Sequence, residues 1–361
     1  MKEFKNKVAL ITGAGNGFGF EFTKEATRRG MKLMLADIDA ADLERTKQWV
    51  LEQGGTVETE VADLSLEEDA DRLVRRTMET YGQIDLLMNN AGIAFGGLVT
   101  DLPSREWEWI FHINCMSHIY TMKRVIPIME KQGTPCHILN VTSLAGLLTM
   151  GDMPSYYATK HFSTALAESV YYDLQRTGID NIKMSVFCPS YVHTDLHHYE
   201  RHRPERYKIP ADDPYYTSEA YKNELKKAEH VITTGSPVDN VGPLVFENIE
   251  KENFYIQMHP NTKPLIRHRM RDILKERNPD FRFTYDISGL VEGRVSLKSI
   301  WYVLTHLCSQ SILYPGSCFF RNREFFLPEK LFFLARDGRM FSFYERKHTP
   351  WQITMKQSLR N

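Results

Sequence analysis

A chain of 361 residues is long enough for one large domain with an appendage. Its 42% hydrophobic and 25% charged residues are ordinary for a globular protein, and a net charge of -1 does not indicate nucleic acid or another strongly charged partner. No run of 18 apolar residues predicts a membrane span, and the start MKEFKNKVAL lacks the apolar region of a secretion signal. Five cysteines without a CxxC pair are typical of reduced thiols, so we expect a cytoplasmic protein.

Short apolar runs alternate with longer segments of helical period from residue 1 to about residue 281. Several runs are apolar throughout, as strands buried on both faces should be. The seven predicted strands are 8–12, 32–37, 57–63, 84–90, 137–142, 182–188 and 254–259. Helical segments lie between them, for instance 18–29, 67–81, 104–131 and 156–177. This order predicts an α/β fold with a Rossmann-type, doubly wound parallel sheet of about seven strands.

Residues 195–236 interrupt this alternation with a polar insertion between the sixth and seventh predicted strands. Substrates of a doubly wound sheet bind beyond the carboxyl ends of its strands, so we expect this insertion to be a substrate lid. Flat apolar tyrosine faces in it favour a bulky hydrophobic substrate, and the alternative is a surface loop that tyrosines decorate. The tyrosines in and beside it are Tyr191, Tyr199, Tyr207, Tyr215 and Tyr216.

Residues 282–361 form a C-terminal extension that is rich in aromatic and basic residues and lacks the alternation of strands and helices. Its segment 297–314 is apolar but interrupted by polar residues, which makes it too polar for a membrane span. A docked helix, an oligomer contact, weak contact with a membrane surface and an extension without a stable fold remain open. We predict two domains, 1–281 and 282–361, and a homo-oligomer, dimer or tetramer.

The first predicted strand runs into the glycine-rich stretch TGAGNGFG at residues 12–19. The spacing G-x-G-x-x-G fails because Phe18 stands in its last position, whereas T-G-x-x-x-G-x-G fits through Gly13, Gly17 and Gly19. A helix that begins here offers unpaired backbone N–H groups and a partial positive charge, which suit a pyrophosphate. An ordinary glycine-rich turn is the alternative. The loop residues expected to contact a dinucleotide are Gly13, Asn16, Gly17, Phe18 and Gly19.

Asp37 ends the second predicted strand about 20 residues beyond the glycines, where an acidic side chain meets the adenosine ribose hydroxyls. Its carboxylate would repel a 2′-phosphate, and positions 16 and 38 are Asn16 and Ile38 rather than basic residues. These features favour NAD over NADP as cofactor. Asp63 and Leu64 follow the third strand and are placed to reach the adenine, and a helix cap is the alternative for Asp63.

Further motifs follow in order: Asn89-Asn90-Ala91-Gly92, Asn114, Ser143, Tyr156-x-x-x-Lys160 and Pro189-Ser190. Together with TGAGNGFG they resemble the short-chain dehydrogenase/reductase family of NAD(P)-dependent oxidoreductases, at its spacings, over residues 5 to about 281. The resemblance implies that the catalytic residues are Asn114, Ser143, Tyr156 and Lys160. It implies further cofactor contacts from Asn90, Ala91, Gly92, Pro189, Val192 and Thr194. The family commonly has Pro-Gly where this chain has Pro189-Ser190, so the contacts of that turn are open.

Hydride transfer between a secondary alcohol and a nicotinamide ring also requires transfer of a proton at the oxygen. Tyr156 accepts that proton only as a partial phenolate, and the ordinary pKa of tyrosine is about 10. Lowering this pKa by about 3 units requires roughly 4 kcal/mol. Lys160, one helical turn on, is expected to supply part of this and to bond the nicotinamide ribose. Ser143 is expected to hold the substrate oxygen, and Tyr157 is the rival phenol.

Asn114 resembles the family asparagine that holds a water for proton relay, with a satisfied buried amide as the alternative. The histidines of the catalytic region form no set with the spacing of metal ligands, so we expect no metal: His112, His118, His161 and His193.

The expected function is hydride transfer between NAD(H) and a secondary alcohol or ketone, with a bulky, hydroxysteroid-like substrate as the first candidate. The alternatives are a 3-oxoacyl-thioester reductase and a dinucleotide-binding module without chemistry. Because Ser143, Tyr156 and Lys160 are all present, the sequence favours an enzyme.

Overall fold

The computed structural model describes residues 1–210, 212–259 and 262–279, together with the backbone of three strands at 330–334, 340–344 and 352–356. The chain divides into two compact units, Met1–Pro260 and Asn261–Asn361. The boundary predicted between residues 281 and 282 lies outside the described residues, as does the segment 297–314.

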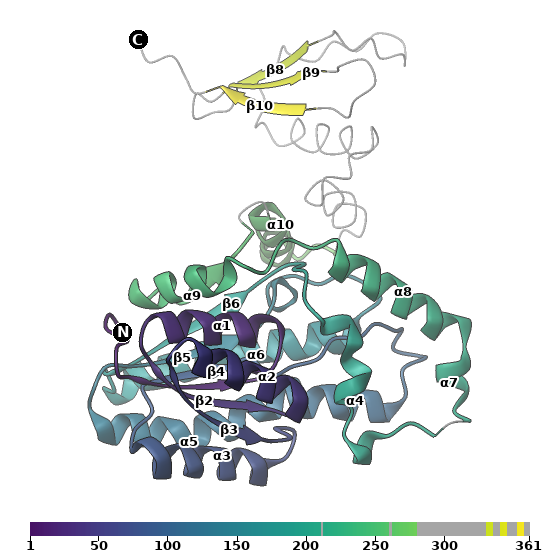
Figure 1. The fold of residues 1–361 in the computed structure, drawn as a ribbon. Coiled ribbons are helices and arrows are strands. Elements are labelled where there is room, and N and C mark those ends of the chain that lie inside the picture. The colour runs from purple at the N-terminus through teal and green to yellow at the C-terminus, as the bar shows by residue number, and fades with distance from the viewer. Residues whose placement is uncertain (211, 260–261, 280–329, 335–339, 345–351, 357–361) are drawn as a thin grey trace, which may run out of the picture. The chain divides into compact units, whose positions relative to one another are not determined.

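The first unit is built on a parallel sheet of seven strands in the order β3-β2-β1-β4-β5-β6-β7 (Figure 1). The strand order reverses between β1 and β4, which is the doubly wound arrangement. The strands are β1 (Val8–Thr12), β2 (Lys32–Asp37), β3 (Thr56–Val61), β4 (Leu86–Asn89), β5 (Cys136–Val141), β6 (Ile182–Cys188) and β7 (Tyr255–Gln257). The predicted fold class is therefore confirmed, and strand ends differ from the predicted ones by at most two residues.

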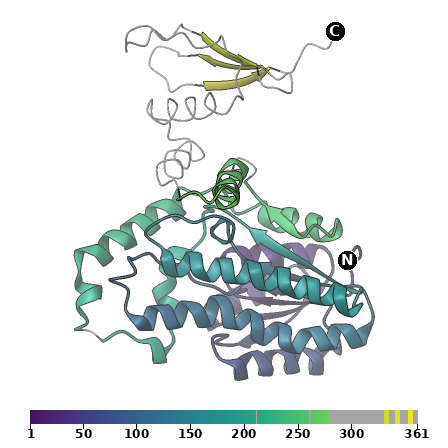
Figure 2. The same ribbon diagram turned by 180° about the vertical axis from the view of Figure 1, so that it is seen from behind.

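Helices cover both faces of this sheet and form a separate apolar core on each (Figures 1 and 2). One core lies under α1 (Gly17–Arg28), α2 (Ala40–Glu52) and α9 (Val241–Glu250). The other lies under α3 (Glu67–Tyr81), α5 (Ser117–Gln132) and α6 (Pro154–Thr177). Side chains alternate along β1, so Ala9 and Ile11 enter the first core and Leu10 the second. This double burial explains why the strand sequences are continuously apolar.

The helical segment predicted over residues 104–131 is helical throughout, but it is not one uniform α-helix. The segment is divided into α4 (Ser104–Phe111), a π-helical turn (His112–Met116) and α5. The backbone N–H of Ser117 bonds the carbonyl of His112, five residues earlier, and this wider turn buries Asn114 and Cys115. Such single π turns interrupt α-helices frequently at functional sites.

The insertion between β6 and α9, which we call the lid, is folded. It contains two 3₁₀ segments, Leu196–His202 and Glu205–Tyr207, followed by α7 (Pro214–Thr217) and α8 (Glu219–Thr233). Backbone hydrogen bonds close it at its base, from His193 N–H to the Ser236 carbonyl at 2.8 Å and from Ser236 N–H to the Tyr191 carbonyl at 3.0 Å. The lid is therefore one loop whose two ends meet at the carboxyl end of β6.

The second unit contains α10 (Lys263–Leu274) and an antiparallel sheet in the order β10-β9-β8. Its strands are β8 (Lys330–Leu334), β9 (Met340–Tyr344) and β10 (Gln352–Lys356). The sequence pattern predicted no elements in residues 282–361. None of the helices in the described part of the chain is long and apolar enough to cross a membrane.

Candidate active site

A single cleft at the carboxyl ends of the strands brings together nearly all of the predicted site residues. Loops after six strands contribute to it, as expected for the point where the strand order reverses. The predicted residues that line it are Gly13, Asn16, Gly17, Phe18, Asp37, Asp63, Leu64, Asn90, Ala91, Gly92, Ser143, Tyr156, Lys160, Pro189, Val192 and Thr194. Gly19 and Asn114 do not line the cleft.

The glycine turn between β1 and α1 has no room for side chains. Gly13 has a φ of 62°, and a Cβ there would lie 2.9 Å from the Cα of Ala91. A Cβ on Gly19 would lie 1.9 Å from the Gly13 carbonyl oxygen, so Gly19 lets α1 pack against the turn. Asn16 caps α1 by accepting the Gly17 N–H at 2.7 Å. This cradle at a helix N-terminus fits a dinucleotide pyrophosphate.

Asp37 lies at the end of β2 beside the glycine turn. Its carboxylate accepts the N–H groups of Gly15 at 2.8 Å and Asp39 at 3.0 Å. Burial raises the pKa of Asp37, and these two backbone hydrogen bonds oppose the shift. Each carboxylate oxygen keeps a further acceptor site for a ribose hydroxyl, because a carboxylate accepts about four hydrogen bonds.

Asp63 makes the local contact of the cap alternative. Its carboxylate accepts the N–H of Ser65 at 3.1 Å in the turn before α3. It also forms an ion pair at 2.6 Å with Arg206 of the lid. A contact between Asp63 and adenine stays a prediction.

Asn90 holds the glycine turn against the end of β4. Its side-chain amide donates to the carbonyls of Thr12 at 3.0 Å and Gly13 at 2.9 Å. Asn89 bonds Asn140 at 3.0 Å and so tethers β4 to β5. The two adjacent asparagines therefore have different tasks, one at the cleft and one in the sheet.

Ser143, Tyr156 and Lys160 all line the cleft. Ser143 follows β5 and is held by the N–H of Ala145 at 3.1 Å, while Tyr156 and Lys160 are one turn apart on α6. The Lys160 ammonium lies 5.6 Å from the Tyr156 ring centre and donates to the Val141 carbonyl at 3.2 Å.

Burial is the largest influence on the pKa values of Tyr156 and Lys160. It raises the pKa of Tyr156 to about 12, although a hydrogen bond from Ser143 opposes the shift. Burial also lowers the pKa of Lys160 to about 8. The lowered Tyr156 pKa expected from the sequence is thus not found in the protein by itself. At neutral pH the phenol is protonated and the lysine is charged.

Asn114 lies in the π turn, fully buried. Its side-chain amide donates to the Ile93 carbonyl at 2.9 Å and to the Thr159 hydroxyl at 3.2 Å, and its oxygen accepts the Ile93 N–H at 2.9 Å. These contacts show the satisfied buried amide that was one alternative. The water relay stays a prediction.

Aromatic residues form the wall beside Tyr156, and of these the sequence analysis named Tyr199 and Tyr207 but missed Trp109. Trp109 of α4 and Tyr199 of the lid line the cleft, and both are buried. Tyr207 packs with them, at 6.3 Å between its ring centre and that of Trp109. Tyr199 and Tyr207 therefore do not decorate a surface loop. The signal that could have indicated Trp109 was the pair of tryptophans in EWEW at residues 106–109, in the segment before Asn114.

A buried ion pair holds the lid to α4. The Arg203 guanidinium bonds both carboxylate oxygens of Glu106, at 2.8 and 3.2 Å, and stacks 4.1 Å from the Trp109 ring centre. Tyr216 of α7 donates to the same carboxylate. Glu106 is 2% exposed, so its charge depends on these partners.

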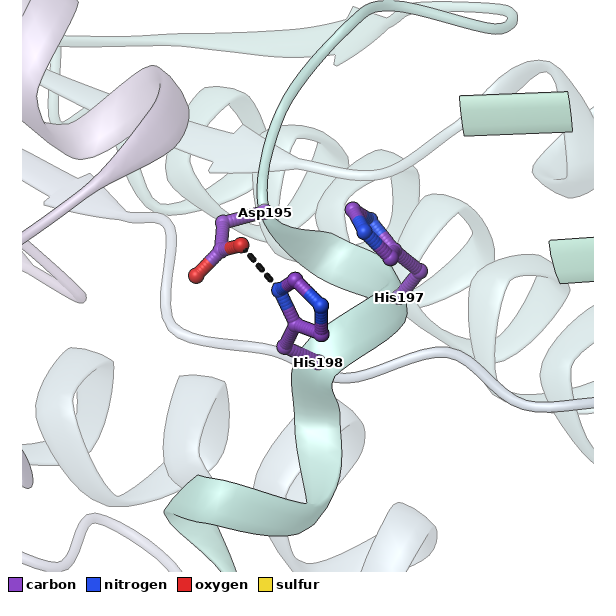
Figure 3. A group of neighbouring side chains, drawn as sticks. All are labelled: Asp195, His197 and His198. Atoms are coloured by element: carbon purple, nitrogen blue, oxygen red, sulfur yellow. Dashed lines mark hydrogen bonds and ion pairs between the residues drawn. The ribbon is translucent and has the colours of Figure 1, made fainter. Parts of the chain in front are cut away.

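Asp195, His197 and His198 at the start of the lid bring three potential metal-binding atoms within 4.8 Å of one another (Figure 3). The sequence analysis did not single out this group. Its carboxylate is already engaged, because Asp195 pairs with His198, with Arg201 at 2.6 Å and with Asn16 at 3.3 Å. A guanidinium at this distance competes with a cation. The group therefore fastens the lid to the glycine turn.

Comparison with known proteins agrees with this geometry. A family model described as short chain dehydrogenase matches residues 7–205. The CLA biosynthesis dehydrogenase/reductase of Lactiplantibacillus plantarum is 50% identical over 280 residues, which cover 78% of this chain and 97% of that protein. A short chain dehydrogenase/reductase from Burkholderia phymatum, crystallised with NAD, has 35% identity and a TM-score of 0.74, over 78% of this chain and 98% of that one. Epidermal retinol dehydrogenase 2 of Homo sapiens is 31% identical, over 54% of this chain and 63% of that protein. The chain belongs to the short-chain dehydrogenase/reductase family.

Proposed function

We propose that this protein is an NAD-dependent oxidoreductase that interconverts a bulky hydrophobic secondary alcohol and its ketone. The observation that carries the proposal is the placement of Ser143, Tyr156 and the buried Lys160 ammonium, 5.6 Å from the Tyr156 ring centre, at the wall of a cleft with a glycine cradle. A cofactor-binding module without chemistry needs none of these three side chains.

The residues divide the chemistry of the carbonyl oxygen among them. The bound nicotinamide supplies or accepts the hydride. The Ser143 hydroxyl donates to the substrate oxygen, and Tyr156 gives its proton to that oxygen in reduction and takes it back in oxidation. The Lys160 ammonium stabilises the phenolate that reduction leaves. With a Tyr156 pKa of about 12, the protein holds the phenol that ketone reduction requires.

Asp37 supports NAD as the cofactor rather than NADP. Its buried carboxylate lies where the adenosine ribose is expected and would repel a 2′-phosphate. The similar Burkholderia phymatum protein was crystallised with NAD. We expect the wild type to prefer NAD in kcat/KM. Replacement Asp37→Ala should narrow or reverse that preference, and a wild type that prefers NADP would contradict the assignment.

The walls of the cleft support a large apolar substrate. Beyond Tyr156 they consist of aromatic and aliphatic side chains: Ile93, Trp109, Ile113, Leu196, Tyr199 and Ile232. Such walls bind apolar surface and reject small polyols, whose hydroxyl groups would lose hydrogen bonds to water. The name of one relative, epidermal retinol dehydrogenase 2, supports an apolar alcohol as the substrate. A hydroxysteroid is our first candidate.

A substrate panel tests the function directly. NADH formation is measured with hydroxysteroids, long-chain secondary alcohols, retinol and polyols, and NADH oxidation with the matching ketones and with 3-oxoacyl thioesters. We expect turnover with hydroxysteroids or other bulky apolar alcohols and none with polyols. Preference for a polyol would overturn the substrate class. NADH binding without turnover of any secondary alcohol or ketone would favour the module without chemistry.

A further inference from the structure

The lid carries a histidine that the proposed reaction does not use. His202 ends the first 3₁₀ segment and lines the cleft at the end that also contains Asp37 and Asp63. Burial raises the pKa of Asp37, while its backbone hydrogen bonds and the nearby His202 imidazole oppose the shift. His202 and the Asp37 carboxylate line the same cleft, and the neighbouring Arg201 pairs at 2.6 Å with Asp42, which lies with Asp37 against Gly15. These contacts place the imidazole on the same side of the cleft as the carboxylate that is expected to bind the adenosine ribose.

Arg201 fixes the tautomer of this histidine. The Arg201 Nε–H donates to His202 Nε2 at 3.2 Å. A guanidinium only donates, so Nε2 is the acceptor and the proton of the neutral ring is on Nδ1. Arg201 is itself fixed by ion pairs with Asp42 and Asp195, each at 2.6 Å.

The Nδ1 atom of His202 is buried, and no residue in the described part of the chain accepts its hydrogen. Buried donors without an acceptor are rare in folded proteins, because each forfeits its hydrogen bond to water. A ribose hydroxyl would satisfy this donor, since a hydroxyl donates one hydrogen and accepts two. It can donate to Asp37 and accept from His202 at the same time.

We propose that His202 of the lid is a cofactor-specificity residue that, together with Asp37, binds the 2′ position of the adenosine ribose. This inference rests on the NAD site proposed above. The lid then has two tasks, because its first segment recognises the cofactor while its aromatic residues cover the substrate. Without Asp37, the same N–H group would donate to a 2′-phosphate.

Fluorescence titration of the full-length protein with NADH tests the contact. His202→Ala removes one neutral hydrogen bond, so the Kd for NADH should rise about five- to tenfold. Binding of nicotinamide mononucleotide, which lacks the adenosine, should not change. The matched control is Lys208→Ala, after the second 3₁₀ segment of the lid, whose ammonium pairs only with Glu205 at the surface among the described residues. An equal loss of affinity for both probes would show general damage to the lid and overturn the proposal.

A double variant separates recognition of the 2′ position from a general effect on affinity. Asp37→Ala should improve NADPH binding relative to NADH, and Asp37→Ala/His202→Ala should lose that improvement. A double variant that binds NADPH as tightly as Asp37→Ala would overturn the role of His202. NADH binding that is unchanged in His202→Ala, with turnover intact, would overturn this inference and leave the proposed function standing. A wild type that binds neither cofactor would overturn both.

Discussion

The floor of the cleft and its lid are held in place by different forces. The floor consists of strand ends whose side chains pack into two apolar cores, one on each face of the sheet. In the lid, α8 has no buried residue, and charged contacts such as Arg203–Glu106 and Arg206–Asp63 fasten the loop. Burial is spread over many side chains, whereas an ion pair depends on two. We therefore expect the floor to keep its geometry after a single substitution and the lid to lose it.

The largest effect should come from the floor, because the chemistry lies there. Tyr156→Phe removes the proton donor and should lower kcat about 10²- to 10⁴-fold. The Kd for NADH should change little, because Ser143, Lys160 and the glycine turn remain. Steady-state kinetics and NADH fluorescence measure the two quantities separately.

Tyr157→Phe is the matched control for this substitution. Tyr157 is the next residue of α6, but it does not line the cleft as Tyr156 does. We expect its kcat to stay within a few fold of wild type. An inactive Tyr157→Phe beside an active Tyr156→Phe would exchange their assigned roles.

Loss of one ion pair should release the lid without unfolding the sheet. Arg203→Met leaves Glu106 buried without its main partner, which costs about 3–5 kcal/mol for an unpaired buried charge. We expect faster hydrogen exchange in α4 and residues 196–217, and a higher KM for the apolar substrate. Strands β1, β4 and β5 should keep their protection.

Two further variants identify the cause of that release. Glu106→Gln in the Arg203→Met background removes the unpaired charge and should restore part of the protection. Lys222→Ala breaks an exposed ion pair with Glu219 elsewhere in the lid and should cost less than about 1 kcal/mol. Equal effects of Arg203→Met and Lys222→Ala would show that burial of the pair does not matter.

The contrast between floor and lid also separates what the sequence predicts from what it cannot. Tyr156 and Lys160 share a helix face, which local periodicity predicts. The place of Ser143 beside them is implied by the resemblance to the family and not by periodicity. Arg203 and Glu106 are 97 residues apart, and either one by itself is typical of an ordinary charged surface. His202 has the same property, since only the fold places it on the same side of the cleft as Asp37.

The π turn at Asn114 marks a second limit of the sequence. One extra residue in a helical turn changes neither composition nor apolar spacing enough to be detected over residues 104–131. The turn changes which side chains point inward, and it buries the Asn114 amide against Ile93. Periodicity therefore predicts that a helix exists, while the orientation of single side chains depends on hydrogen bonds to distant backbone.

The pH dependence of ketone reduction should report Lys160. Below its pKa of about 8 the lysine is charged and stabilises the phenolate that Tyr156 becomes. As the pH rises through this value the charge is lost, so kcat/KM for reduction should fall, approaching about tenfold per pH unit. Lys160→Arg keeps a positive charge at all these pH values and should remove the fall, whatever its absolute rate. A profile unchanged in Lys160→Arg would assign the titration to another group.

The smallest effect on the chemistry should come from the chain beyond residue 281. The proposed cofactor and catalytic residues, and the whole lid, precede residue 260, and Met1–Pro260 forms a compact unit with its own two cores. The relative from Lactiplantibacillus plantarum matches over 280 residues that make up 97% of its length but 78% of this chain, so part of this chain has no counterpart in it. A protein that ends at residue 281 should therefore keep its Kd for NADH and its kcat within a few fold. Light scattering on the full-length protein and on the shortened protein measures whether the extension sets the oligomeric state. Loss of NADH affinity in a shortened protein with an unchanged melting transition would place the extension in the active site.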